Sequence, residues 1–574
     1  MCGISGIIEK TVHENTGAKM LQAQKHRGPD AIGEWSAEQI WLGHNRLSII
    51  DLSAAANQPM HSRDGRFVIV FNGEIYNYKE LIQQYSAKLN LTTLSDTEVL
   101  LELFALKGEA ILHELIGMFA FAIWDKKEHT LFAARDRFGV KPFFYSKPNN
   151  AFLFASEIKT IHAAGIAKEP DTATWSGYLT QGTYGEPSTT FWKNIYQLPG
   201  GHCLTYQLAT KKITINKWYE FETQLTKSGG CNELELMETY ESLLTNAVSL
   251  RFRSDVPVGV AVSGGLDSSL LLATIAQTQV TSKQLYAYTF YSHNEVYNEL
   301  PWVNALIEQH NLFVQDAVLF DWKDIPIQAE KMAAQQDEPY GGFPTIAYAN
   351  IFAKASFAGV KVLLDGQGMD EAWAGYDYYW NNSDSLIQGG TTTATQSGIL
   401  DAAFAAKALK FQPHQPFDNK LQNLQYRDLF YTKLPRALRF NDRASMLHSL
   451  ELREPFLDHR LVEFAFSLPA GMKYVQGLPK WQLRKLAEKW MHSKISLAPK
   501  RPVQTPQREW LKNELKDWAN THLHWLATKG NPGWFEAKKM LSAWKQYCDG
   551  TGDNSFFIWQ WINTALLLQS NRQY

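Results

Sequence analysis

The stretch Val256-Pro-Val-Gly-Val-Ala-Val262-Ser-Gly-Gly-Leu-Asp-Ser-Ser269 decides the fold of the larger part of the chain. Its first half is apolar and β-branched, which predicts a buried strand, and an apolar helix follows the glycines and serines. Further strand candidates at 285–290, 312–319 and 360–365 alternate with helical segments. This alternation predicts a parallel sheet covered by helices on both faces.

The loop Ser263-Gly-Gly-Leu-Asp-Ser-Ser269 follows the strand at its carboxyl end, where parallel sheets bind their ligands. Glycines let backbone N–H groups converge, a helix N-terminus adds partial positive charge, and the serines add hydroxyl donors. These features suit a pyrophosphate group; the alternative is an ordinary glycine-rich turn. The sequence lacks the GxxxxGK[ST] phosphate loop.

A second loop, Leu364-Asp-Gly-Gln-Gly-Met-Asp-Glu371, follows another predicted strand. Asp267 of the first loop and Asp370 of the second offer hard oxygen ligands of the kind that Mg²⁺ prefers. In the alternative interpretation these aspartates only cap helices.

The first 215 residues have a different pattern, with short strands and turns. Phe67-Val-Ile-Val-Phe71 predicts a buried strand that ends in an Asn72-Gly73 turn, and 97–105 predicts a helix capped by Ser95 or Asp96. Lys227-Ser-Gly-Gly230 is polar and flexible. We therefore divide the chain into a first domain at 1–215, a linker at 216–234 and a second domain at 235–574, mainly helical after Gly398.

Composition excludes several classes of protein. At roughly 100–200 residues per domain, 574 residues allow two to four domains. With 56 basic and 58 acidic residues the net charge is −2, which gives no global attraction to nucleic acid or acidic membranes. Four cysteines do not make a disulfide framework, and no apolar run reaches the ~18–20 residues of a membrane helix. We expect a soluble, cytoplasmic protein that binds neither nucleic acid nor membrane.

Cys2 follows the initiator methionine directly. If Met1 is removed, we expect an exposed sulfur beside its own α-amine, whose pKa of about 7.7–8.0 suits a general base. The alternative is an incidental buried cysteine.

Other residues of this region are what a glutamine site at a thiol needs. Arg46 can grip an α-carboxylate, and Glu74 and Asp96 can hold an α-ammonium group. Asn72 and the Gly73 N–H can stabilise an oxyanion. Each also has an ordinary explanation, because Asn-Gly is common in hairpins and Ser-Asp is common at helix caps.

Together these motifs are recognisable. The chain resembles the glutaminase half of glutamine-hydrolysing asparagine synthetases over about residues 1–200. This resemblance implies an N-terminal-nucleophile fold, an α/β/β/α sandwich, with Cys2 as the nucleophile and with Arg46, Asn72, Gly73, Glu74 and Asp96 binding glutamine and its oxyanion. The motifs that carry it are Met1-Cys-Gly-Ile-Ser-Gly6, His26-Arg-Gly-Pro-Asp30, 43–51, Phe71-Asn-Gly-Glu-Ile-Tyr-Asn77, Ser95-Asp-Thr-Glu98 and Ala134-Arg-Asp-Arg137.

The second half resembles the synthetase half of the same family over about 235–510, and its first loop is similar to that of ATP pyrophosphatases. The resemblance rests also on 434–443, 449–458 and Lys480-Trp-Gln-Leu-Arg484. It implies that Lys480 neutralises phosphate charge and that Asp267 and Asp370 hold Mg²⁺. Lys500-Arg501 either adds charge to this site or is simply exposed. The ATP-binding residues it implies are Ala261, Ser263, Gly264, Gly265, Asp267, Ser268, Ser269, Asp365 and Gly366.

One loop departs from the family. Asparagine synthetases usually carry Ser-Gly-Glu-Gly where this chain has Asp365-Gly-Gln-Gly368, and a glutamine amide cannot accept a proton at neutral pH as that glutamate is thought to do. Gln367 is then either a tolerated spacer or a changed catalytic position. We hypothesise that Asp365 supplies the missing function, because residues i and i+2 share a face if the strand continues.

The sequence thus predicts a glutamine-dependent asparagine synthetase. Glutamine hydrolysed at Cys2 supplies ammonia, which passes through an internal tunnel by family resemblance and attacks an aspartyl-AMP made from ATP and aspartate. Glutamate, AMP, pyrophosphate and asparagine are released. Two alternatives stay open: a relative that amidates another carboxylate, such as a surface-sugar precursor, or a non-catalytic glutamine or ATP sensor. A homodimer is considered as the assembly.

Overall fold

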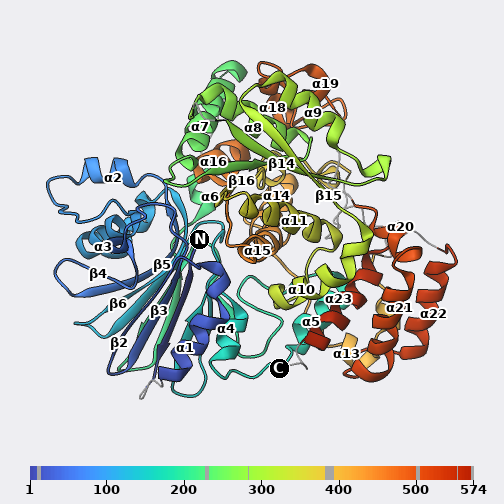
Figure 1. Cartoon of the computed structure of the whole chain (residues 1–574), viewed down its shortest axis with the longest axis horizontal. Helices are drawn as coiled ribbons and strands as arrows, with labels where there is room; N and C mark the ends of the chain where they lie inside the picture. Colours follow the sequence, from blue (N-terminus) through green and yellow to red (C-terminus); the bar gives the residue numbers. More distant parts are fainter. Residues whose placement is uncertain are drawn as a thin grey trace.

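The computed structural model describes residues 1–9, 14–225, 232–281, 284–381, 394–498, 505–551 and 554–570. An N-terminal half (residues up to 225) lies beside a C-terminal half (residues from 232 on), on the left and right of Figure 1. The expected linker segment 227–230 and the pair Lys500-Arg501 lie outside the described residues.

The N-terminal half contains two antiparallel six-stranded sheets packed face to face, each covered by helices on its outer side (Figure 1). Apolar side chains such as Ile4, Leu42, Val70 and Ala122 fill the space between the sheets and are fully buried. The first sheet has the order β10 (Tyr196–Gln197), β8 (Phe144–Ser146), β9 (Phe152–Ala155), β1 (Gly3–Ile8), β3 (Ile40–Arg46) and β2 (Ala31–Ala37). The second has the order β12 (Lys212–Lys217), β11 (His202–Gln207), β7 (Thr130–Arg135), β6 (Gly117–Asp125), β5 (Phe67–Ile75) and β4 (Met60–His61).

Helices complete four layers. Helix α1 (Glu14–Ala23) packs on β1, β3 and α4 (Ile158–Ala163). On the other side α3 (Asp96–Lys107) packs on β4 and β5 and against α2 (Tyr78–Gln84). The Ser95 hydroxyl accepts from the Thr97 N–H and caps α3, as the sequence predicts. The predicted α/β/β/α sandwich is confirmed.

The predicted turn at Asn72-Gly73 is wrong. Both residues lie inside β5, paired with Ala120 and Phe119 of β6. The glycine is required by a close approach rather than by a turn, because a Cβ on Gly73, at φ +155°, would lie 2.1 Å from the Met118 carbonyl oxygen.

The C-terminal half is built on a five-stranded parallel sheet, as predicted. Its order is β15 (Phe313–Leu319), β14 (Leu285–Tyr291), β13 (Val258–Ala261), β16 (Val362–Leu364) and β17 (Glu451–Arg453). The helices around it include α7 (Glu233–Arg251), α8 (Leu266–Thr278), α9 (Leu300–Gln309), α10 (Ile325–Gln336), α11 (Phe343–Phe357), α14 (Lys420–Phe430), α15 (Lys433–Met446), α16 (His459–Ser467) and α18 (Trp481–Ala487).

Strand β17 was missed, because 398–574 was expected to be mainly helical. It has three residues, too few to show a period of two, and it is held by main-chain pairing of Leu364 with Arg453. This edge strand faces the N-terminal half, with which it exchanges the contacts described below.

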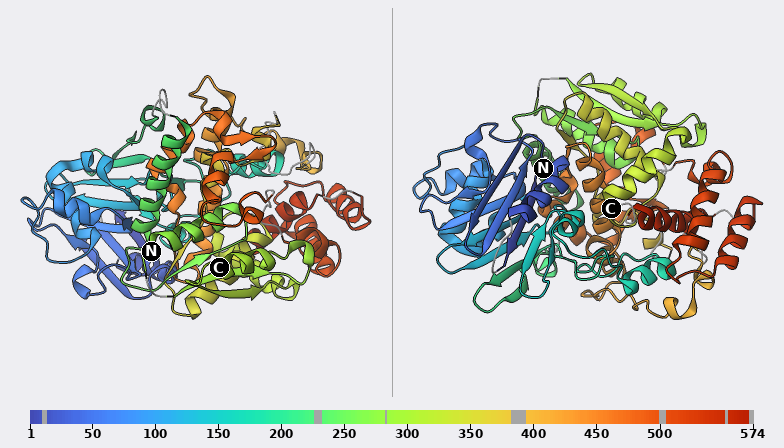
Figure 2. Two further views of the ribbon diagram at one scale, coloured as in Figure 1. Left: turned by 90° about the horizontal axis from the view of Figure 1, so that it is seen from above. Right: turned by 60° about the horizontal axis from the view of Figure 1, so that its bottom comes forward.

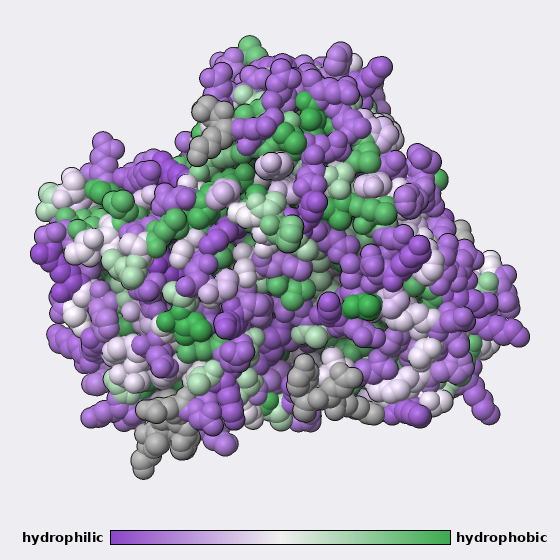
Figure 3. Space-filling view, viewed as in Figure 1, coloured by the Kyte–Doolittle hydropathy of each residue, from purple (hydrophilic) through white to green (hydrophobic). Residues whose placement is uncertain are grey.

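Apart from the short antiparallel pair β18 (Tyr474–Val475) and β19 (Leu478–Pro479), the rest of the C-terminal region is mainly helical. Its last helices are α20 (Gln507–Lys512), α21 (Lys516–Trp525), α22 (Ala537–Cys548) and α23 (Phe556–Ser570), drawn in red in Figure 2. Phe557, Trp559 and Trp561 of α23 pack in the core, and Trp559 donates through Nε1 to the Tyr340 carbonyl. The face shown in Figure 3 is mostly polar with scattered apolar areas. Among the described residues no helix is both long and apolar enough to span a bilayer.

Candidate active sites

Cys2 lies just before β1 and beside the end of β5. Its backbone N–H donates to Asn72 Oδ1 at 2.9 Å, and Sγ lies 3.9 Å from the Leu47 carbonyl oxygen. The side chain is buried while Met1 is present, so the exposed sulfur expected after removal of Met1 stays a prediction. Burial raises the pKa of the Cys2 thiol, partly opposed by the nearby positive chain terminus. A neutral thiol of this kind needs a base to become a nucleophile.

Met1 covers this site and is itself buried. Its ammonium group lies 3.2 Å from Glu451 Oε2, and both groups are inaccessible to solvent. Glu451 belongs to β17, so the C-terminal half places a carboxylate beside the start of the chain.

The amide of Asn72 is placed as an oxyanion donor must be. Oδ1 is occupied by Cys2, whereas Nδ2 is buried and has no hydrogen-bond partner. A buried N–H group left without an acceptor is costly unless a ligand uses it. The adjacent Gly73 keeps the backbone of β5 against β6.

Glu74 and Asp96 lie near each other, as predicted. Asp96 Oδ2 accepts from the Ile75 N–H at 2.8 Å, and burial raises the Asp96 pKa to about 6. Glu74 Oε1 lies 3.3 Å from Nη2 of Arg453, and its Oε2 is buried without a partner. Burial raises the pKa of Glu74 although Arg453 opposes the shift. The sequence did not indicate Arg453, which comes from the other half of the chain.

Arg46 is engaged with a neighbouring loop. Its Nη1 donates to the Ser53 carbonyl and to Asn57 Oδ1, each at 2.7 Å, and Nη2 bonds to the carbonyl of Asp51. The guanidinium therefore holds the loop that follows β3, and its field lowers the pKa of Cys2. Its contact with a substrate carboxylate stays a prediction.

The predicted phosphate-binding loop lines a cavity of about 310 Å³ at the carboxyl ends of β13 and β16, here called the loop cavity. Ser269 alone of the predicted ATP-binding residues is not among those lining it, because its side chain is fully buried within α8. The predicted residues that do line the cavity are Ala261, Ser263, Gly264, Gly265, Asp267, Ser268, Asp365, Gly366, Gln367, Asp370 and Lys480.

Lys480 joins the two loops. Its Nζ lies 2.5 and 2.6 Å from the carboxylate oxygens of Asp267 and 2.7 Å from Asp370 Oδ1. Burial disfavours the ammonium form, but the two aspartates outweigh it and raise the pKa of Lys480. Gly375 makes room for this cluster, because a Cβ there would lie 2.0 Å from Asp370 Oδ1 and 2.2 Å from Lys480 Cε.

Asp365 and Gln367 both line the loop cavity, but not for the reason expected. Strand β16 ends at Leu364, so the two residues do not share a strand face. Instead Asp365 Oδ1 accepts from the Gln367 N–H at 2.9 Å, while Oδ2 is buried and has no partner. Burial raises the pKa of Asp365 to about 6.

Four lining residues with polar side chains were not predicted: Tyr348, Glu371, Tyr376 and Arg484. The Tyr376 hydroxyl donates to Glu371 Oε1 at 2.7 Å, and burial raises the pKa of Glu371 to about 7. Glu371 and Tyr376 follow Asp370 closely, so their proximity to the second loop was the available signal. Tyr348 lies in the middle of a helix and carries no such signal.

Buried contacts hold the two sites in one framework. Arg27 donates to the Cys2 carbonyl at 3.0 Å and forms an ion pair with Asp442 of α15 at 2.9 Å. Lys141 Nζ donates to the Leu452 carbonyl at 3.3 Å. The C-terminal half therefore completes the thiol site with residues of α15 and β17.

Comparison with protein-family models gives two matches. Residues 1–219 match a glutamine amidotransferase domain, and residues 239–569 match asparagine synthase. The chain belongs to the asparagine synthase family. This protein is therefore an ATP-dependent ligase that hydrolyses glutamine, and its N-terminal half has the N-terminal-nucleophile fold that the resemblance implied.

Curated relatives cover nearly the whole chain. Glutamine-hydrolysing asparagine synthetase 1 of Bacillus subtilis is 28% identical over 97% of this chain and 95% of its own length. Asparagine synthetase 3 of the same organism is 30% identical over 91% and 90%. The amidase chry2 of Gibberella zeae is 26% identical over 89% of this chain and 90% of its own length.

Proposed function

We propose that this family member is a glutamine-dependent asparagine synthetase, with the β-carboxylate of aspartate as the acceptor. One observation carries the proposal: strand β17 of the synthetase half borders both sites, placing Glu451 and Arg453 at the thiol site and pairing with the strand that ends at Asp365. The relatives named asparagine synthetases support the choice of aspartate.

The first reaction takes place at Cys2 after removal of Met1. The new α-amine takes the thiol proton, Sγ attacks the glutamine amide carbon, and Asn72 Nδ2 with the Gly73 N–H stabilises the oxyanion. Glu74 and Asp96 hold the substrate ammonium, and Arg46 its carboxylate. Ammonia leaves, and water then hydrolyses the thioester to glutamate.

The second reaction takes place in the loop cavity. An aspartate carboxylate oxygen attacks the α-phosphorus of ATP and displaces pyrophosphate, giving aspartyl-AMP. The glycine-rich loop offers backbone N–H groups to the phosphates, and Lys480 neutralises negative charge as the bond to pyrophosphate breaks. Adenylation thus replaces a carboxylate oxygen, which is a poor leaving group, by AMP, which is a good one.

Mg²⁺ fits this cavity with two protein ligands. Asp267 and Asp370 reach the same Lys480 ammonium, so both carboxylates converge on one cation position. Among the described residues no cluster of three or more His, Cys, Asp or Glu could hold a metal. Two carboxylates, phosphate oxygens and water are a usual coordination for Mg²⁺. Bound there, the ion would neutralise phosphate charge; the lysine does so from the protein.

In the last step ammonia attacks the adenylate carbonyl, and the C–O bond to AMP breaks. We assign to Asp365 a proton-accepting role that Gln367 cannot take, because Asp365 has a free carboxylate oxygen in the cavity wall. Ammonia travels between the sites inside the protein. Bulk water is excluded there and cannot protonate it to ammonium.

A second candidate acceptor is favoured by two observations. The position usually held by glutamate in asparagine synthetases is Gln367, and one relative of similar coverage is named an amidase. A change in acceptor, with the glutaminase half intact, accommodates both facts. A cytoplasmic location and a homodimer complete the proposal.

The test is a product assay with purified protein, glutamine, ATP, Mg²⁺ and aspartate. Asparagine, AMP and pyrophosphate formed in equal amounts support the proposal. AMP that requires an acid other than aspartate supports the second candidate. Glutamate without any AMP contradicts both.

A further inference from the structure

Glu454 is a buried carboxylate to which no role has been assigned. It follows β17 directly, and its side-chain atom Oε2 is buried without a hydrogen-bond partner. The Asp365 N–H donates to the Arg453 carbonyl at 2.9 Å, so Glu454 and Asp365 leave neighbouring strand ends side by side. A free carboxylate oxygen at such a depth is costly unless it serves a purpose.

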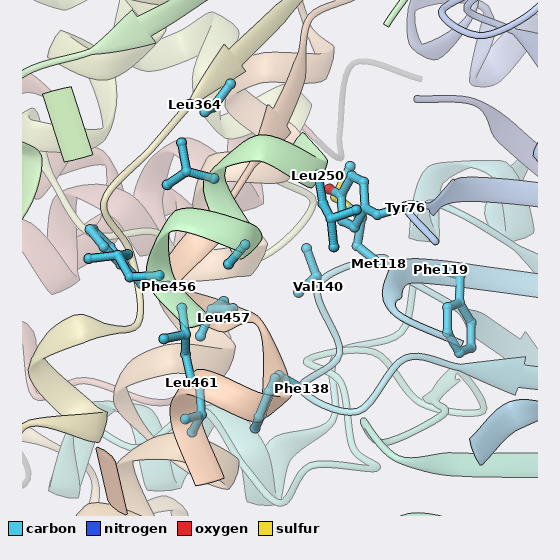
Figure 4. Packing of buried hydrophobic residues seen from close by; sticks show 14 of the residues in the cluster. Tyr76, Met118, Phe119, Phe138, Val140, Leu250, Leu364, Phe456, Leu457 and Leu461 are labelled. Carbon is cyan, nitrogen blue, oxygen red and sulfur yellow. The ribbon is translucent and has the colours of Figure 1, made fainter. Parts of the chain in front are cut away.

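Glu454 also lines a small cavity between the two halves. The cavity has a volume of about 10 Å³, enough for about one water-sized molecule, and ammonia is of that size. Figure 4 shows Tyr76 and Met118 of the N-terminal half beside Leu250 of the C-terminal half, with Val140 between this group and Leu457. Apart from Glu454, the cavity is lined by Tyr76, Ile116, Gly117, Met118, Asp136, Arg137, Phe138, Val140, Arg251, Leu457 and His459.

The second carboxylate of this cavity, Asp136, is saturated. Oδ1 accepts from the N–H groups of Phe138 and Val140, and Oδ2 accepts from those of Phe119 and Lys141. Of the carboxylates that line the cavity, Glu454 is therefore the one with an oxygen available to a guest.

The remaining charged groups around the cavity already have partners, although Nε of Arg137 and Nε of Arg251 are buried without a hydrogen bond. Arg251 pairs with Asp458 at 2.6 Å, and Arg137 donates to the carbonyls of Leu115 and His113. Burial lowers the pKa of His459, which favours its neutral form. Two arginines beside the cavity repel ammonium, so the space suits neutral ammonia.

We propose that Glu454 accepts the proton that ammonia loses on forming the amide, acting together with Asp365 across the wall between this cavity and the loop cavity. The proposal rests on the proposed ligase reaction and adds a second proton acceptor to it.

The step balances as follows. The lone pair of ammonia forms the C–N bond at the adenylate carbonyl, and the C=O π pair moves onto oxygen. One N–H proton passes to the carboxylate pair, the carbonyl re-forms, and AMP leaves with the electrons of the C–O bond. The proton left on the pair returns to solvent through the loop cavity.

The acidities of the pair suit this role. Burial raises the pKa of Glu454 to about 7 and that of Asp365 to about 6, and the Asp365 carboxylate contributes to the rise at Glu454. Lys141 lowers the pKa of Glu454, while Asp442 and Asp136 raise it further. Groups that titrate near the working pH exchange protons most effectively.

The test bypasses glutamine by supplying ammonium chloride. For Glu454→Gln we expect asparagine formation to fall by about 10²-fold, while aspartate-dependent ATP–pyrophosphate exchange changes by less than about twofold. Hydroxylamine, whose adduct loses its proton more readily, should form aspartyl hydroxamate at close to the normal rate. Glu454→Asp should restore part of the ammonia reaction.

A matched control is Glu463→Gln, which removes a half-buried carboxylate that is bonded to Tyr219 at 2.7 Å and lines neither cavity. It should leave the ratio of amide formation to pyrophosphate exchange unchanged. Equal losses of exchange, hydroxamate and amide in Glu454→Gln would overturn the proposal, as would no loss at all.

Failure of the proposed function has a separate signature. If the natural protein gives no exchange with aspartate, the acceptor is wrong, and Glu454 is then tested by infrared difference spectroscopy without substrate. The expected result is a carboxyl group titrating near neutral pH that disappears in Glu454→Gln. A spectrum in which Glu454→Gln removes no such titration contradicts the proposal.

Discussion

The thiol site and the loop cavity differ in how complete each is within its own half of the chain. The loop cavity takes all its lining from the C-terminal half and has space for a ligand, with Lys480 already held between Asp267 and Asp370. The thiol site is covered by Met1 and takes Glu451 and Arg453 from the other half. Glutamine hydrolysis should therefore depend on maturation and on docking of the halves, whereas adenylation should not.

The largest expected effect is the loss of the glutamine-dependent reaction while the ammonia-dependent reaction continues. Cys2→Ala should lower glutamine-dependent amide formation by about 10³-fold or more, because no other nucleophile can form the thioester. Ammonia-dependent formation should persist at close to the natural rate. Cys548→Ala, a control at a half-buried cysteine, should change neither rate. Retained glutaminase activity in Cys2→Ala would contradict the assignment.

Lys480→Met should produce the reverse pattern. We expect adenylation, measured by ATP–pyrophosphate exchange, to fall by about 10²–10³-fold because phosphate charge is no longer neutralised. Glutamine hydrolysis measured alone should remain. Lys485→Met changes a solvent-exposed lysine on the same helix and serves as the control. Loss of exchange in both variants would point to damage to the helix instead.

Gly375→Ala tests whether the ion pairs of Lys480 with Asp267 and Asp370 are already in their catalytic arrangement. The added methyl would displace the Asp370 carboxylate or Lys480, and misplacement by about 1 Å can cost about 10²-fold in rate. Gly471→Ala, where nothing lies within 4 Å of the added carbon, should have no effect. ATP–pyrophosphate exchange measures both. Normal exchange in Gly375→Ala would show that the cluster is rearranged during catalysis.

The smallest effect is a pH dependence at the thiol site. Because burial raises the Asp96 pKa to about 6, its carboxylate is ionised above that pH and becomes protonated as pH falls through it. Binding of the glutamine ammonium should weaken accordingly, and KM for glutamine should rise about tenfold per pH unit below 6. In Asp96→Asn the KM should be high and flat over this range. An unchanged pH profile in that variant would assign the titration to another group.

The contrast between the sites also explains what could be predicted from the sequence. The loop cavity was predictable because glycines, serines and aspartates that act together lie within a few positions of one another, directly after a strand. Cys2 and its partners were recognisable as motifs. The burial of Cys2 beneath Met1 was not, because the Met1 ammonium is held by Glu451, which lies more than 400 positions away in the sequence.

The interface was the part that could not be predicted. Strand β17 is three residues long, and its pairing with β16 depends on the whole intervening chain. Glu451, Arg453 and Glu454 therefore carried no local signal for their positions between the sites. The course of Asn72-Gly73 through β5 was likewise decided by pairing with β6, which overrides the local preference of Asn-Gly for a turn.

The central claim is that nitrogen released at Cys2 is consumed in the loop cavity without leaving the protein. The direct measurement supplies glutamine labelled with ¹⁵N in its amide, together with unlabelled ammonium chloride, and determines the label in the asparagine formed. We predict asparagine that carries the label in full even when unlabelled ammonium is in excess. Asparagine whose label matches the mixed ammonium pool would contradict the account.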